Sequence, residues 1–182
     1  MVSEKDLVRA MKEAWKGREG YTVAVFEKGW FLSAEKWSVF IPSGLLPRKS
    51  LALVVEHIGE IPKIAQAYTC TKRGGAQMAT AAMLEGEAQE LLRVGNINRA
   101  ERTQLKHGEY ALWQNADTLR VIAIDENYSD IAGEQMRQCA FCSGDCMYFC
   151  LKGVVLKVHG EYIGSVVRDY LSAMQWCGNA EG

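Results

Sequence analysis

The spacing of apolar residues predicts a helix at the start of the chain, followed directly by strands. Ser3 has the form of an N-cap, and Gly17 supplies a stop signal. After Gly17 the pattern changes to short segments rich in β-branched and aromatic residues, which is typical of an antiparallel meander. The helix face consists of Leu7, Val8, Met11, Ala14 and Trp15. The expected strands are residues 21–27, 30–33 and 36–41.

The rest of the chain predicts further helices and strands that do not alternate regularly. Regular alternation would indicate a doubly wound parallel sheet, so we expect an α+β fold: a single domain, residues 1–182, with an antiparallel or mixed sheet and about five or six helices packed on it. Strands are expected at residues 65–71, 119–124, 146–151 and 154–158. Helices are expected at 51–58 (capped by Ser50), 76–94 and 98–106, in a segment ending near Cys142, and from Glu161 onward.

Composition and charge exclude several classes of protein. The 182 residues are 48% hydrophobic and 24% charged, which are ordinary values for a globular protein. The net charge of −1 gives no overall field that would attract nucleic acid or an anionic membrane. The first residues lack the apolar core of a secretory signal, and no segment is apolar enough to span a bilayer. We therefore expect a cytoplasmic protein without a membrane partner.

Four of the six cysteines lie close together, at positions 139, 142, 146 and 150. In a reducing compartment they are not expected to form a disulfide framework. All four cannot bind one ion from a regular element, because residues 139 and 150 would lie about 16 Å apart on a helix, and residues 146 and 150 about 13 Å apart on a strand. A turn at residues 143–145 would instead allow a structural zinc site made by Cys139, Cys142 and Cys146, with His159, Cys70 or Cys177 as the fourth ligand. The alternative is that the cysteines are reduced core residues.

Basic residues gather around the predicted helix 98–106. Together with the preceding helix this segment has the outline of a helix-turn-helix, and its positive charges are the best local candidate for contacts to nucleic acid. The alternative is an ordinary solvated helix, because the segment is polar on all sides. The residues concerned are Arg93, Arg99, Arg102 and Lys106.

No phosphate-binding loop or local catalytic set is present in the sequence. The leading interpretation is therefore a non-enzymatic cytoplasmic binding or regulatory protein, with another protein as its expected partner and a structural metal at the 139–146 turn. The second hypothesis is a nucleic-acid-binding regulator that uses the basic helix. The third is an enzyme with a cysteine thiolate as nucleophile and His159 or His107 as base.

Overall fold

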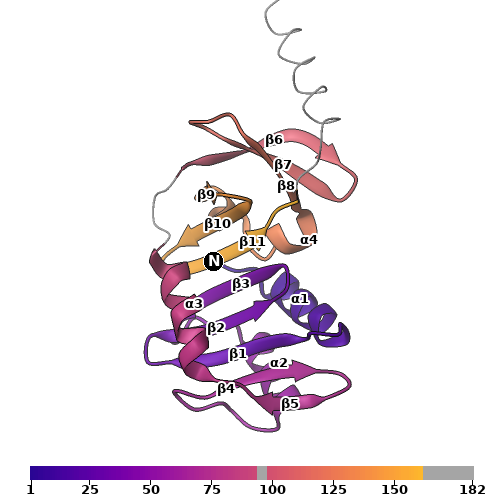
Figure 1. Cartoon of the computed structure of the whole chain (residues 1–182), viewed down its shortest axis with the longest axis vertical. Helices are drawn as coiled ribbons and strands as arrows, with labels where there is room; N and C mark the ends of the chain where they lie inside the picture. Colours follow the sequence, from indigo (N-terminus) through magenta and orange to yellow (C-terminus); the bar gives the residue numbers. More distant parts are fainter. Residues whose placement is uncertain (94–97, 162–182) are drawn as a thin grey trace, which may run out of the picture.

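The computed structural model describes residues 1–93 and 98–161, and two antiparallel sheets dominate it (Figure 1). The larger sheet has eight strands, and the smaller one has three. In spatial order, the large sheet contains β5 (Gly75–Met78), β4 (Ala67–Thr71), β1 (Tyr21–Phe26), β2 (Gly29–Ala34), β3 (Trp37–Pro42), β11 (Val154–His159), β10 (Cys146–Leu151) and β9 (Ala140–Ser143). The small sheet contains β6 (Ala100–His107), β7 (Tyr110–Asn115) and β8 (Val121–Asp125).

The helices are fewer and shorter than expected, so the prediction of a sheet carrying five or six packed helices is wrong. In the described part of the chain only three helices exceed a single turn: α1 (Glu4–Lys16), α2 (Arg48–Ile58) and α3 (Ala81–Arg93). The other two, α4 (Glu126–Ser129) and α5 (Glu134–Arg137), have four residues each. None of the described helices is long and apolar enough to cross a bilayer.

The N-terminal third of the chain follows its local sequence signals. The Ser3 hydroxyl accepts a hydrogen bond from the Asp6 amide, and the Gly17 amide donates to the carbonyls of Glu13 and Ala14, so α1 has the predicted ends. The predicted meander is confirmed as β1, β2 and β3. Helix α2 begins at Arg48 rather than after Ser50, whose side chain is completely buried.

Residues 98–106, which were predicted to be a helix, form strand β6. Asn98 does not begin a helix. It precedes the extended backbone of β6, and its carbonyl accepts a hydrogen bond from the Cys142 amide at 2.9 Å. A segment that is polar on all sides has no apolar stripe to hold a helix on the core. Pairing with the apolar strand β7 satisfies its backbone, and the Thr103 hydroxyl donates to the Leu112 carbonyl at 2.9 Å.

Three further helix predictions need correction or lie outside the described residues. Residues 140–143 form strand β9, because Ala140 and Cys142 alternate with Phe141 between two faces of the sheet. Gly144, with φ of 59°, begins a two-residue turn to β10 rather than capping a helix. The helix predicted for 76–94 begins only at Ala81, after strand β5. The helix predicted from Glu161 onward falls on residues 162–182.

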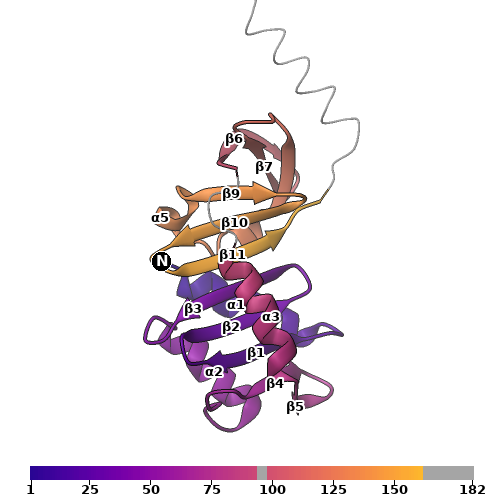
Figure 2. The same ribbon diagram turned by 60° about the vertical axis from the view of Figure 1, so that its left-hand side comes forward.

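The main core lies between one face of the large sheet and a layer made of α1, α2 and the small sheet. The contact between the two sheets is aromatic. The rings of Trp113 on β7 and Phe149 on β10 meet edge to face, with centroids 5.3 Å apart, and both side chains are buried. Helix α3 covers part of the opposite face, where it runs across the strands (Figure 2).

Candidate functional site

The clustered cysteines lie on opposite faces of the large sheet. Cys142 on β9 points into the main core, where its sulfur accepts a hydrogen bond from the Asn115 amide group at 3.1 Å. Cys146 and Cys150, on β10, belong to the cluster on the α3 side. Because the sheet separates these sulfurs, Cys142 and Cys146 cannot bind the same ion.

The four predicted zinc ligands are therefore not brought together. One pair among them is in contact: the Cys146 sulfur lies 3.7 Å from Nδ1 of His159 on the neighbouring strand. Over residues 1–93 and 98–161, no group of three or more His, Cys, Asp or Glu side chains is arranged to hold a metal ion. Of the other candidate ligands, Cys70 is buried in β4, and Cys177 lies outside the described residues.

The basic residues also do not form the predicted helical surface. Lys106 and Arg102 both bind the carboxylate of Glu126, Lys106 at 2.7 Å. Arg99 lies 3.7 Å from Glu101, and Arg93 ends α3 in another part of the fold. Strand pairing thus places acidic partners beside most of this positive charge, and these four residues do not form a continuous basic face in the described part of the chain.

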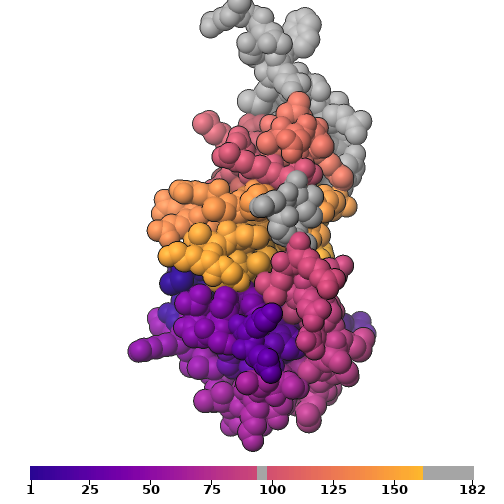
Figure 3. Space-filling view, turned by 90° about the vertical axis from the view of Figure 1, so that its left-hand side faces the viewer, coloured from indigo at the N-terminus to yellow at the C-terminus, as the bar shows by residue number. Residues whose placement is uncertain are grey.

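A candidate site lies beside α3 on the sheet face that looks away from the main core. Figure 3 shows this face, with α3 on its right. Register places apolar side chains in one row across the strands. Phe31 pairs with Phe40, and Phe40 pairs with Val155. Ala88 and Leu91 of α3 belong to the same buried cluster as this row. Packing against this row therefore holds α3 on the sheet. The helix leaves the adjacent row of side chains partly uncovered.

The adjacent row is polar, and its members come from distant parts of the sequence. Ser33 pairs with Ser38, Ser38 with Lys157, and Lys157 with Tyr148. Side chains at directly paired positions lie on the same face of the sheet. Hydroxyl, ammonium and phenol groups therefore form a continuous polar floor across β2, β3, β11 and β10. None of these four residues was among the functional candidates predicted from the sequence.

A cavity of about 380 Å³ lies over this floor. We call it the α3 groove; its lining includes Ser33, Ser38, Ser143, Tyr148, Lys157 and His159 from the strands and Glu87, Glu90 and Leu91 from the helix. Its size falls within the usual range for small-molecule sites. The helix wall is acidic, whereas the strand wall carries Lys157 and His159. Within the described part of the chain, Glu87, Glu90 and Lys157 form no ion pair.

Two groups of the groove are uncharged near neutral pH. Burial, the Cys146 thiol and the Glu90 carboxylate together raise the pKa of Tyr148 to about 12, so its phenol is available as a hydrogen-bond donor. Burial and the nearby ammonium groups of Lys157 and Lys36 lower the pKa of His159. Its imidazole is therefore neutral and can act as an acceptor.

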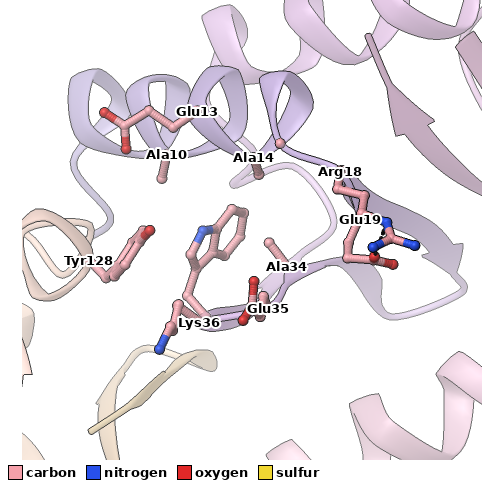
Figure 4. Close-up of a pocket in the computed structure, with 12 residues that line it drawn as sticks. Ala10, Glu13, Ala14, Arg18, Glu19, Ala34, Glu35, Lys36 and Tyr128 are labelled. Carbon is pink, nitrogen blue, oxygen red and sulfur yellow. Dashed lines mark ion pairs between the residues drawn. The ribbon is translucent and has the colours of Figure 1, made fainter. Parts of the chain in front are cut away.

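A second, smaller cavity of about 220 Å³ lies between α1, the β2–β3 turn and α4 (Figure 4). Both of its basic side chains already have carboxylate partners: Arg18 lies 3.6 Å from Glu19, and Lys36 lies 3.2 Å from Glu161. The groups left open are mainly the carboxylates of Glu13 and Glu35. It therefore lacks the opposed charges of the α3 groove.

Comparison with known proteins gives no independent guide to the site: no protein-family model matches the chain, and a search of curated proteins finds no similar sequence. One signal in the sequence points toward the groove. Thr22, Ser33 and Ser38 interrupt otherwise apolar strands, and all three fall in the polar row. A small hydroxyl residue repeated on one face of a meander is unexpected if that face is entirely covered.

Proposed function

We propose that this chain is a cytoplasmic, non-enzymatic binding protein whose ligand occupies the α3 groove. The observation that supports this most strongly is the pair of opposed walls, with the carboxylates of Glu87 and Glu90 on one side and the ammonium group of Lys157 on the other. Charged groups that form no ion pair with another described residue, and that line a cavity of small-molecule size, are available for a ligand.

The charge pattern favours a small zwitterion such as a free α-amino acid. A ligand ammonium group would bind Glu87 and Glu90, and a ligand carboxylate would bind Lys157 and the phenol of Tyr148. Ser33 and Ser38 add hydroxyl groups that can donate or accept. A ligand with only one charge would leave one wall unpaired, which is how such a site discriminates between related molecules.

The first prediction concerns the affinity of the groove. In calorimetric titrations of the full chain with a panel of free α-amino acids, at least one is expected to bind, whereas its N-acetyl and amide derivatives bind at least about tenfold more weakly, because each lacks one charge-assisted contact. Lys157→Gln and the double substitution Glu87→Gln, Glu90→Gln should each weaken binding to a similar extent.

Matched controls lie on the same elements. Glu85 is on α3 but faces another cavity, on the opposite flank of the helix, and Lys152 lies in the turn of the β10–β11 hairpin. Glu85→Gln and Lys152→Gln should leave the affinity unchanged. Equal binding of the zwitterion and its singly charged derivatives, or equal losses in the control variants, would contradict the proposal.

The contact between Cys146 and His159 supports a second candidate function, a nucleophilic thiol at the edge of the groove. Burial raises the pKa of the Cys146 thiol, while Lys157 opposes this shift. The resting pair is therefore a neutral thiol beside a neutral imidazole. In a reaction, Nδ1 of His159 would accept the thiol proton as the sulfur adds to a carbonyl carbon of the ligand and the π electrons of that carbonyl move to its oxygen.

The second prediction tests this pairing by alkylation. Under native conditions, iodoacetamide is expected to modify Cys146 before Cys139, which is also half-buried but has no histidine contact. Replacing His159 with glutamine should slow the modification of Cys146 at least about tenfold, as expected when a general base is lost. Peptide mass spectrometry over time measures both rates. Modification of Cys139 at the same rate, unaffected by His159→Gln, would exclude a special role for Cys146.

A further inference from the structure

Two of the clustered cysteines lie opposite each other, Cys150 on β10 and Cys139 directly before β9. Ala140 of β9 pairs with Phe149 of β10, so the register places the preceding residue, Cys139, across from Cys150. The Cys150 amide donates to the Cys139 carbonyl at 3.1 Å. This bond continues the register by one residue, and residues that face each other in an antiparallel pair have Cα atoms about 4.5–5.5 Å apart. This lies within the range of about 4.4–6.8 Å found across disulfides.

The other described cysteines are not placed to compete for Cys150. Cys146 is on the same strand and the same face, but an extended chain separates residues 146 and 150 by about 13 Å. Cys142 points into the core on the opposite face, and Cys70 is buried in β4. Both Cys139 and Cys150 are half-buried rather than enclosed, so a small reagent can reach them.

We propose that Cys139 and Cys150 form a reversible dithiol site that a low-molecular-weight disulfide such as oxidised glutathione converts to a cross-strand disulfide. The Cys139 thiolate attacks one sulfur of the reagent and releases one glutathione thiolate. The Cys150 thiolate then attacks the resulting mixed disulfide at the Cys139 sulfur and releases the second. Two thiols of the protein are oxidised, the reagent is reduced to two glutathione molecules, and these take up the two protons.

The position of this bond gives it a structural consequence. Strand β9 is at the edge of the large sheet, and it also holds the segment that enters the small sheet: Arg99 forms a bridge with Phe141, and the Cys142 amide donates to the Asn98 carbonyl. A disulfide from Cys139 to Cys150 would fix β9 to β10 beside this junction. In a reducing compartment the dithiol is the resting form, and oxidation stiffens the link between the two sheets.

The test is peptide mapping of the full native chain after incubation with oxidised glutathione. The expected product has lost two hydrogen atoms, contains a Cys139–Cys150 crosslink that dithiothreitol reverses, and melts at a higher temperature than the reduced protein. Cys139→Ser should abolish the crosslink, whereas Cys146→Ser, on the same strand and face as Cys150, should leave it unchanged.

Other products of the same digest would overturn the proposal. A crosslink from Cys150 to Cys146 or Cys177 would show that the register does not control pairing. Stable glutathione adducts on Cys139 and Cys150 without a crosslink would show that the two sulfurs do not approach each other. Because the wild-type digest alone distinguishes these products, the result does not depend on the folding of any variant.

Discussion

Replacing Phe149 with alanine is expected to lower the free energy of unfolding by about 3–5 kcal/mol. The side chain is fully buried, and its ring meets Trp113 across the contact between the large and small sheets. Its removal would leave a cavity at the contact between the two sheets, and the surrounding structure relaxes only partially around such a cavity. Urea denaturation followed by circular dichroism measures the loss.

Phe141→Ala is the matched control for this prediction. Phe141 is also aromatic and lies on β9, the strand that pairs with β10. It is only half-buried, however, and it faces the α3 side. Phe141→Ala should lower the free energy of unfolding clearly less than Phe149→Ala, because less buried apolar area is lost and water can occupy the space. If Phe149→Ala cost about 1 kcal/mol or less, the packing of the two sheets described here would be wrong.

Gly20→Ala is expected to lower the free energy of unfolding by about 2–4 kcal/mol, because the backbone at this position does not accommodate a side chain. Gly20 has φ of 72°, and an added Cβ would lie 2.2 Å from the Cys70 carbonyl oxygen. That oxygen belongs to the β1–β4 ladder, in which Tyr21 pairs with Cys70. The clash therefore cannot be relieved without disturbing the pairing. Thermal and urea unfolding measure the effect.

Substitutions at two other glycines distinguish the steric clash at Gly20 from the strain that a positive φ causes. Gly44 has φ of 84° but open space around it, so Gly44→Ala should show only the left-handed backbone cost of about 1–2 kcal/mol. Gly86 lies inside α3 with no neighbour within 4 Å, and Gly86→Ala should stabilise the protein by about 0.5–1 kcal/mol. Equal losses for Gly20→Ala and Gly44→Ala would contradict the close approach of Gly20 to β4.

The parts of the fold that the sequence predicts well are those fixed by local chemistry. Helix α1 has its N-cap, its apolar stripe and its glycine stop within one continuous segment. The β10–β11 hairpin has its turn at Lys152 and Gly153, both with positive φ. Strand β6 could not be predicted in this way. Its sequence is polar and resembles a capped helix, and it is extended because β7 offers a partner, which is a non-local effect.

The candidate site depends even more on non-local pairing. Ser38 and Lys157 are neighbours only because β3 pairs with β11, and a register shift of one residue would turn Lys157 to the other face. The cysteine cluster shows the same limit. Its spacing suggested a turn that gathers three sulfurs, whereas strand alternation sends Cys142 to one face and Cys146 to the other. Composition could identify the candidate residues but not which of them meet.

The central claim, that the α3 groove binds a zwitterionic small molecule, is tested most directly by two-dimensional nuclear magnetic resonance of the ¹⁵N-labelled chain titrated with the same panel of amino acids. Changes in amide chemical shift are expected to concentrate in the polar row, at Ser33, Ser38, Lys157 and Tyr148, and to disappear in Lys157→Gln. Shifts that gather instead around the second cavity, near Glu13 and Tyr128, or that persist in Lys157→Gln, would contradict it.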